Sequence, residues 1–182
     1  MAARDKVAPP PVLLDEQGQR RFEELIAERV ADADPASWSL FTFTLGAGRR
    51  AEALMADVAR PHGLDGAQFS VLLVLWMNGP PFRLSPTTLS RYIAQSPSGM
   101  THTVKRLTSA GLVHRVGLET DGRAKHVELT EEGERIVAQC ATDLAAAVKD
   151  TFASDGVDTA ALAASLRQVA TILTMRESRP NP

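Results

Sequence analysis

The sequence predicts a mainly α-helical protein that carries one small β-hairpin. Aromatic residues make up only 5% of the 182 residues, and apolar residues recur at helical spacing along most of the chain. The exception is a pair of short apolar stretches, 112–118 and 124–129, joined by a polar link at 120–123 that suits a hairpin tip. Two helices separated by a tight turn precede this pair. Helix, turn, helix and hairpin in that order predict a winged helix-turn-helix, which we expect together with a helical dimerisation region.

The composition is that of a globular protein without a membrane span. Hydrophobic residues are 44% and charged residues 23% of the sequence, and a chain of 182 residues can form one domain or a small domain with added helices. No run of about 18 apolar residues occurs, so we expect no membrane partner. The single cysteine, Cys140, excludes an intrachain disulfide framework and fits the reducing cytoplasm, where we expect the protein to act.

Two helices are expected before residue 62. Residues 1–14 lack the apolar core of a signal peptide, and their prolines favour a disordered arm. A charged helix with a narrow apolar stripe follows, from residue 15 to about residue 33. Asp34 and Pro35 are residue types preferred at the start of a helix, and Pro61 ends this second, more apolar helix.

Capping residues mark the next two helices. Asp65 with Gln68 three residues later resembles a capping box, which predicts a helix that ends at the turn 78–81. Ser85 before Pro86 begins the first helix of the helix-turn-helix.

The second helix of the pair has the features of a DNA-recognition helix. Ser96 is its expected N-cap, and Gly111 ends it. Its apolar stripe consists of Met100, Val104 and Leu107. The opposite face carries hydroxyls, an imidazole and cations, namely Ser98, Thr101, His102, Lys105 and Arg106. Such groups reach base edges and phosphates when a helix lies in the major groove, so we expect this face and Ser96 to contact DNA.

The charge distribution favours the same segment. The whole chain has a net charge of -2, yet residues 62–130, the expected DNA-binding domain, carry a net of +3 and leave -5 for the remainder. No acidic residue occurs between Asp65 and Glu119. A carboxylate there would be repelled by the duplex, so this distribution predicts a phosphate-facing surface. The alternative is that a mostly buried segment lacks acids by chance.

Two helices are expected after the hairpin. Thr130, followed by three acids, is a helix N-terminus, and Asp155 or Asp158 caps a last helix. These helices, like those before residue 62, carry apolar stripes that need a partner. A second copy is the simplest partner, because two-fold dimers are the commonest oligomers and match palindromic sites. We therefore expect 15–61 and 131–178 to form the interface of a homodimer.

Five segments of the chain form a specific pattern. They are Leu64-Asp65-Gly66-Ala67-Gln68-Phe69, Leu84-Ser85-Pro86, Gly111-Leu112-Val113-His114-Arg115, Thr120-Asp121-Gly122-Arg123 and Val127-Glu128-Leu129-Thr130-Glu131-Glu132-Gly133. Together they resemble the MarR family of bacterial transcription regulators, over about residues 36–175. The resemblance implies a winged-helix dimer that binds a double-stranded DNA operator. Such a dimer usually dissociates from the operator when it senses a small molecule or an oxidant. We expect a repressor of a palindromic operator.

The resemblance also assigns roles in the wing. It implies that Arg123 lies at the wing tip in the minor groove and that Asp121 holds the wing in shape by pairing with a nearby arginine. This agrees with the physics, because a narrow minor groove concentrates negative potential and attracts arginine. Arg115 and Lys125 belong to the same cationic set. Two further arginines, Arg91 and Arg106, are either phosphate contacts or internal salt-bridge partners.

Within the family, the added N-terminal helix and the stretches 79–86 and 98–101 resemble the urate-responsive subgroup. Its ligand site is associated with a tryptophan, an aspartate and two arginines, and Trp38 and Arg115 match two of these positions. Ser70 and Thr103 stand where the aspartate and the other arginine are expected. The missing aspartate and arginine are the groups that would hold a planar anionic purine such as urate in place. We therefore expect a different small anionic or aromatic effector, or none.

An effector pocket is predicted where the flanking helices meet the winged domain, since hinge regions are common small-molecule sites. Its expected residues are Trp38, Phe41, His62, Phe69, Ser70, Thr103 and Arg115. A ligand there would favour a spacing of the two recognition helices that no longer fits the operator. The alternative is that the aromatic residues only form core.

No enzyme, cofactor or metal function is expected. The sequence has no nucleophile elbow, no phosphate-cradling loop and no carboxylate pair outside solvated helix faces. The four histidines are scattered, and a lone cysteine on an apolar stripe is more typical of core than of a metal site. The remaining alternative is a protein-interaction module whose winged helix does not bind specific DNA. The cationic set Lys105, Arg115, Arg123 and Lys125 opposes it.

Overall fold

The computed structural model describes residues 16–118, 121–153 and 156–177. The predicted arm at 1–14 lies outside these residues. The side chains of 118–125 are also outside the description, and so are the predicted contacts of Asp121, Arg123 and Lys125. No described helix is long and apolar enough to cross a membrane.

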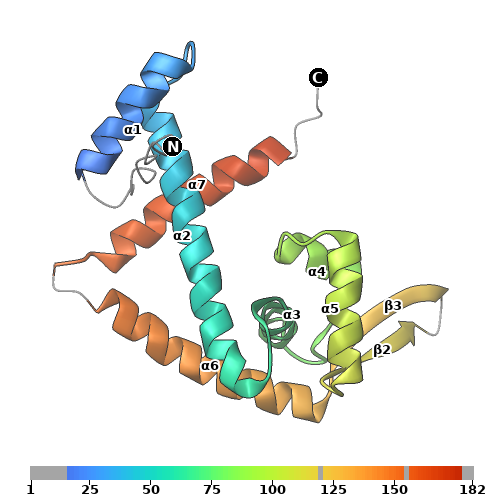
Figure 1. The fold of residues 1–182 in the computed structure, drawn as a ribbon. Helices are drawn as coiled ribbons and strands as arrows, with labels where there is room; N and C mark the ends of the chain where they lie inside the picture. The colour runs from blue at the N-terminus through green and yellow to red at the C-terminus, as the bar shows by residue number, and fades with distance from the viewer. Residues whose placement is uncertain (1–15, 119–120, 154–155, 178–182) are drawn as a thin grey trace, which may run out of the picture. The chain divides into compact units, whose positions relative to one another are not determined.

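Helices account for most of the described chain, as the sequence predicts (Figure 1). The elements in order are α1 (Glu16–Arg29), α2 (Pro35–Ala59), the 3₁₀ helix η1 (Arg60–His62), α3 (Gly66–Met77), β1 (Arg83–Leu84), α4 (Pro86–Tyr92), α5 (Pro97–Ser109), β2 (Val113–Leu118), β3 (Asp121–Leu129), α6 (Glu131–Phe152) and α7 (Thr159–Glu177). The chain divides into two compact units, which meet between Asp57 and Val58 within α2.

The first unit contains α1 and most of α2. Ser39 Oγ on α2 donates a hydrogen bond to Glu23 Oε1 on α1 at 2.9 Å, which ties the two helices together. Asp34 caps α2 as predicted, because its carboxylate accepts from the Ser37 hydroxyl at 2.5 Å and from the Ser37 N–H at 2.9 Å. These hydrogen bonds hold the pKa of the Asp34 carboxyl below its ordinary value.

The second unit contains the helix-turn-helix, a three-stranded sheet and α6. Its core is built from α3, α4, α5, the sheet and α6, and its largest fully buried side chains are Phe69, Leu72, Leu75, Leu89, Met100 and Leu107. Every predicted cap in this part is confirmed. Asp65 and Gln68 form both halves of a capping box, and Ser85, Ser96 and Thr130 each accept a backbone N–H in the first turn of their helices.

The sheet differs from the prediction in two ways. Its strand order is β1-β3-β2, and the two-residue strand β1, which places Arg83 opposite Glu128, has no counterpart in the sequence analysis. The predicted link at 120–123 is also wrong, because β3 already begins at Asp121, which pairs with Leu118. Strand pairing uses backbone groups, so polar residues can continue a hairpin. The strand therefore extends beyond the apolar stretch from which it was predicted. A register irregularity between Gly117 and Leu118 accompanies this extension.

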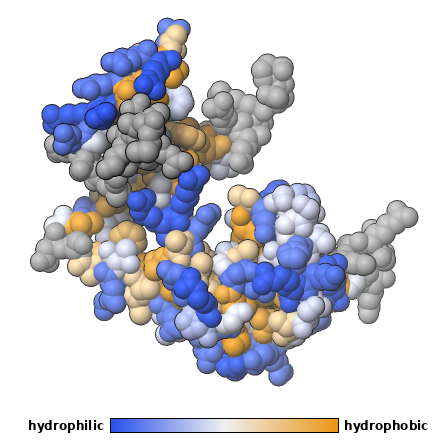
Figure 2. All heavy atoms as spheres, viewed as in Figure 1, coloured by the Kyte–Doolittle hydropathy of each residue, from blue (hydrophilic) through white to orange (hydrophobic). Residues whose placement is uncertain are grey.

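The last helix begins after Asp158, whose Oδ1 accepts the Ala161 N–H at 3.0 Å. Of the two predicted caps, Asp158 is therefore the one observed, while Asp155 lies outside the described residues. Hydrophobic residues on α7 and α2 remain at the surface, where Figure 2 colours such residues orange. They are Leu162, Leu166, Ile172, Leu173 and Met175 on α7 and Trp38, Leu40, Phe41, Phe43 and Leu45 on α2. Apolar exposure on this scale is typical of a surface that a partner covers.

Candidate nucleic-acid interface

Helix α5 has one buried face and one exposed face. Met100, Val104 and Leu107 are almost fully buried, as the stripe predicts. The exposed residues include the five of α5 that are predicted to contact DNA: Ser98, Thr101, His102, Lys105 and Arg106. Helix α5 packs against α3, α4 and β2, so its buried face is held by three neighbours (Figure 1). A helix fixed on one side and polar on the other can enter a major groove without losing its core contacts.

The hydroxyls near the start of α5 are partly used by the helix itself. Ser96 Oγ accepts the Gly99 N–H at 3.2 Å and lies 3.2 Å from Ser98 Oγ. Thr101 Oγ1 donates to the Pro97 carbonyl at 2.9 Å, which leaves its lone pairs free to accept. His102 and Lys105 make no hydrogen bond or ion pair with any other described residue. Their side chains are therefore the most available donors on this face.

Arg106 is engaged within the protein. Its guanidinium pairs with Asp65, and its Nη2 lies 3.4 Å from Gln68 Oε1. Of the two roles that the sequence leaves open, the structure contains the internal salt bridge. Arg91, at the end of α4, is exposed and forms no ion pair within the described part of the chain.

A row of three side chains crosses the sheet, namely Arg83 on β1, Glu128 on β3 and His114 on β2. Glu128 on β3 pairs with Arg83 on β1, and its other oxygen lies 3.7 Å from His114 Nε2 on β2. Arg115, the next residue on β2, is exposed. This row could not be predicted from the sequence, because a two-residue strand is too short to show a periodic pattern. The row joins all three strands at the end of the hairpin nearest the core.

Thr130 connects the segment after α5 to α6. Its Oγ1 donates to the Gly111 carbonyl at 2.8 Å and accepts the Gly133 N–H at 3.0 Å, while its own N–H donates to the Leu112 carbonyl at 3.1 Å. Gly133 is buried against the same carbonyl, and a Cβ at Gly133 would lie 2.0 Å from Leu112 O. The segment from Leu129 to Gly133 thus contacts the residues between α5 and β2 and holds the end of α5 and the start of the wing in place.

The residues predicted for the effector pocket are distributed over both units. Trp38 and Phe41, in the first unit, are 38% and 55% exposed. In the second unit Phe69 is fully buried, and Thr103 is 5% exposed with its Oγ1 accepting from Gln95 Nε2 at 3.1 Å. These two side chains are core residues of the second unit in the observed state.

The other predicted pocket residues have local partners or lie on the wing. Ser70 Oγ donates to the Gly66 carbonyl at 2.9 Å. His62 Nε2 lies 2.7 Å from Asp143 Oδ2 on α6. Arg115 is exposed at the base of the wing. The role of the whole set in binding an effector stays a prediction.

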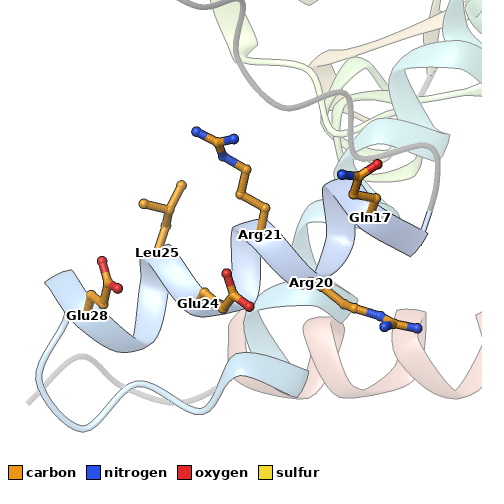
Figure 3. A pocket seen from close by; sticks show the side chains of 6 residues that line it. All are labelled: Gln17, Arg20, Arg21, Glu24, Leu25 and Glu28. Carbon is orange, nitrogen blue, oxygen red and sulfur yellow. The ribbon is translucent and has the colours of Figure 1, made fainter.

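Two of the surface depressions have at least two charged residues in their lining. The larger, of about 690 Å³, is lined by residues of α1 alone: Gln17, Arg20, Arg21, Glu24, Leu25 and Glu28 (Figure 3). Arg20 and Arg21 point to opposite sides of that helix, so the depression has no converging cations. A second, of about 450 Å³, runs along α5 and is lined by Gln68, His102, Lys105, Arg106, Ser109 and Ala110. No group of three or more potential metal ligands occurs among the described residues.

Comparison with known proteins agrees with this geometry. Residues 62–124 match the model of the MarR family. The matched segment runs from the end of η1 into β3 and so covers the helix-turn-helix and most of the hairpin. The chain is 30% identical over 76 residues to the HTH-type transcriptional regulator PecS of Dickeya dadantii, a match that spans 42% of this chain and 46% of PecS. It is 28% identical over 113 residues to the HTH-type transcriptional repressor YetL of Bacillus subtilis, across 62% of this chain and 67% of YetL.

Solved structures share the MarR-type fold over a longer part of the chain. The MarR family regulator Sco3205 of Streptomyces coelicolor, solved in complex with DNA, superposes with a TM-score of 0.69 at 22% identity over 81% of this chain and 91% of its own. CouR of Rhodococcus jostii RHA1, solved with p-coumaroyl-CoA, gives a TM-score of 0.64 at 21% identity over 75% of this chain and 92% of its own. At these identities the likeness establishes the fold.

Proposed function

We propose that this chain is a sequence-specific DNA-binding transcription regulator that binds its operator through α5 and the β2–β3 wing. The observation that carries the proposal is the division of α5 into a buried apolar face and an exposed face with His102 and Lys105 unpaired among the described residues. A MarR-type domain over residues 62–124 supports it. The wing would place Arg123 in the minor groove, as the sequence resemblance implies. Arg115 and Lys125 would add to its cationic surface.

The proposal includes a homodimer on a palindromic operator. The exposed apolar residues of α2 and α7 would be covered by the second copy, which agrees with segments 15–61 and 131–178 acting in dimerisation. Two recognition helices related by a two-fold axis would then read two half-sites about one helical turn apart. A monomeric mass in solution at micromolar concentration would refute this part.

We propose that the protein acts in the cytoplasm as a repressor and that a small effector releases it from the operator. The relative YetL is a repressor by its name, and CouR was solved with an acyl-CoA ligand, so both features occur in proteins of similar sequence or fold. We propose a small anionic or aromatic effector rather than urate, because Ser70 and Thr103 lack the charges that the urate-responsive subgroup provides. If Trp38→Ala left the response to an identified effector unchanged, the pocket proposed around Trp38 would be wrong.

Fluorescence anisotropy on duplexes that tile the DNA upstream of the protein's own gene tests DNA binding. We expect tight, salt-sensitive binding to one near-palindromic duplex, because neutralised phosphates release counterions. Arg123→Ala should weaken that binding, because it removes the arginine proposed for the minor groove. Equal, weak binding to every duplex, together with no enriched site in a genome-wide pull-down, would favour a protein-interaction module instead.

A further inference from the structure

The pairing of Arg106 with the cap of α3 gives this arginine a role different from that of its neighbours on α5. Asp65 Oδ1 accepts the Gln68 N–H at 2.8 Å, and Gln68 Oε1 accepts the Asp65 N–H at 3.0 Å. Asp65 Oδ2 accepts from Arg106 Nη1, and Gln68 Oε1 also lies 3.4 Å from Arg106 Nη2. The guanidinium therefore contacts both members of the capping box.

We propose that Arg106 is a positioning residue that fixes the rotation of α5 about its own axis, rather than a DNA contact. This inference rests on the proposed function and deepens it, because it separates two adjacent cations that the sequence cannot distinguish. In this account Lys105 contacts the DNA backbone, while Arg106, Asp65 and Gln68 form a clasp that aims the recognition face.

The physical reason is that the clasp adds a directional restraint to the core contacts that hold the buried face of α5. The hydrophobic effect is non-directional, and the buried face of α5 consists mainly of the apolar residues Met100, Val104 and Leu107. Charge-assisted hydrogen bonds from a planar guanidinium are directional. Successive residues lie about 100° apart around a helix, so a clasp at Arg106 sets the direction of Lys105 and of His102 one turn earlier.

The clasp contributes little to global stability. The side chains of Arg106 and Asp65 are 49% and 43% exposed, and ion pairs of that exposure are screened by solvent. Its effect should appear in DNA affinity. When α5 is rotated away from the binding orientation, a smaller fraction of the molecules can bind DNA. This gives the inference a test in which stability and binding respond differently.

The decisive variant is Asp65→Asn. Asparagine is as good an N-cap as aspartate, so α3 keeps its cap and loses only the charge partner of Arg106. If the clasp positions α5, Asp65→Asn binds the operator about 3- to 10-fold more weakly, with an unchanged salt slope. If Arg106 instead leaves Asp65 to contact a phosphate, removing the competing carboxylate makes binding tighter. The two accounts therefore predict opposite signs.

Arg106→Lys gives a second, independent readout. Lysine keeps the positive charge but cannot bond Asp65 and Gln68 with one fork. Positioning predicts weaker binding at the same salt slope, and the double variant Asp65→Asn with Arg106→Lys should be no weaker than the weaker single variant. A phosphate contact predicts near-normal affinity for Arg106→Lys, and a slope reduced by about 0.9 for Arg106→Ala.

The matched control is Glu131→Gln, which neutralises an exposed acid of the same unit that has no ion pair among the described residues. Its affinity should be equal to or slightly tighter than that of the native protein. Thermal unfolding midpoints of all single variants should stay close to the native value. Weaker binding accompanied by a large fall in the Asp65→Asn midpoint would overturn the positioning role in favour of a purely structural one.

A measurement without DNA separates failure of this inference from failure of the proposed function. Amide hydrogen exchange of α5 should be faster in Asp65→Asn and unchanged in Glu131→Gln, with α4 unaffected in both. Unchanged exchange of α5 in Asp65→Asn would overturn the clasp. If the clasp is seen by exchange but no duplex is bound specifically by the native protein, the proposed function fails and the clasp stands.

Discussion

Replacing Gly133 with alanine should destabilise the protein, although alanine is the better helix former. A Cβ at this buried position would lie 2.0 Å from Leu112 O and 3.0 Å from Leu112 C, both backbone atoms. Because real Cβ contacts of this kind are longer than 3.0 Å, α6 or the segment after α5 would have to move by about an ångström. The Leu112 carbonyl also accepts the Thr130 N–H at 3.1 Å, so the movement strains the same junction.

The expected cost follows from two opposing terms. Overpacking a tight site costs about 1–3 kcal/mol and occasionally more, and contact with backbone places this site at the upper end. Alanine in place of glycine in a helix returns about 1 kcal/mol. The net is a loss of about 2 kcal/mol, which for a chain of this size lowers the thermal midpoint by about 4–8 °C.

Circular dichroism at 222 nm during heating measures the effect. Gly48→Ala is the matched control, because Gly48 lies in helix α2 and a Cβ there meets no described atom within 4 Å. It should raise the midpoint slightly, by the helix-propensity term alone. A Gly133→Ala midpoint equal to or above that of the native protein would show that the junction between α5 and α6 is not tightly packed.

Three further predictions follow from the same structure. Thr130→Ala removes both the cap of α6 and the hydrogen bond to Gly111, so it should lower the free energy of unfolding by about 1–2 kcal/mol, as measured by thermal or urea unfolding. Thr130→Ser keeps both hydrogen bonds and serves as the control. Equal stability of the two variants would contradict the assigned contacts. Lys105→Ala should weaken operator binding and lower the salt slope by about 0.9, and a reduced affinity with the slope intact would mean that Lys105 does not meet a phosphate. Burial raises the pKa of the Cys140 thiol, and the negative charge of Asp143 raises it further. Thiolate should therefore be scarce at neutral pH, and a thiol reagent should react quickly only after unfolding. Rapid reaction of the native protein would refute this.

The helix boundaries could be predicted from the sequence because their signals are local. The capping box at Asp65 and Gln68 spans four residues, and the caps at Ser85, Ser96 and Thr130 act within one turn. The buried and exposed faces of α5 follow from the spacing of Met100, Val104 and Leu107. Each of these features depends only on neighbouring residues, so a single sequence contains the necessary information.

The contacts that join distant segments could not be predicted. Arg106 and Asp65 are 41 residues apart, and His62 and Asp143 are 81 apart, so neither pair has a sequence signature. The strand β1 exists because Arg83 and Leu84 pair with β3, since two residues alone have no strand preference of their own. These tertiary pairings decide whether a cation faces solvent or an internal acid.

The proposed function requires that the winged helix-turn-helix of this chain bind one DNA sequence in preference to others. The most direct test compares the dissociation constants for the upstream near-palindromic duplex and for a shuffled duplex of the same composition, both at physiological salt. We expect the native protein to bind the palindromic duplex at least about 1,000-fold more tightly than the shuffled duplex. Equal dissociation constants for the two duplexes would contradict it.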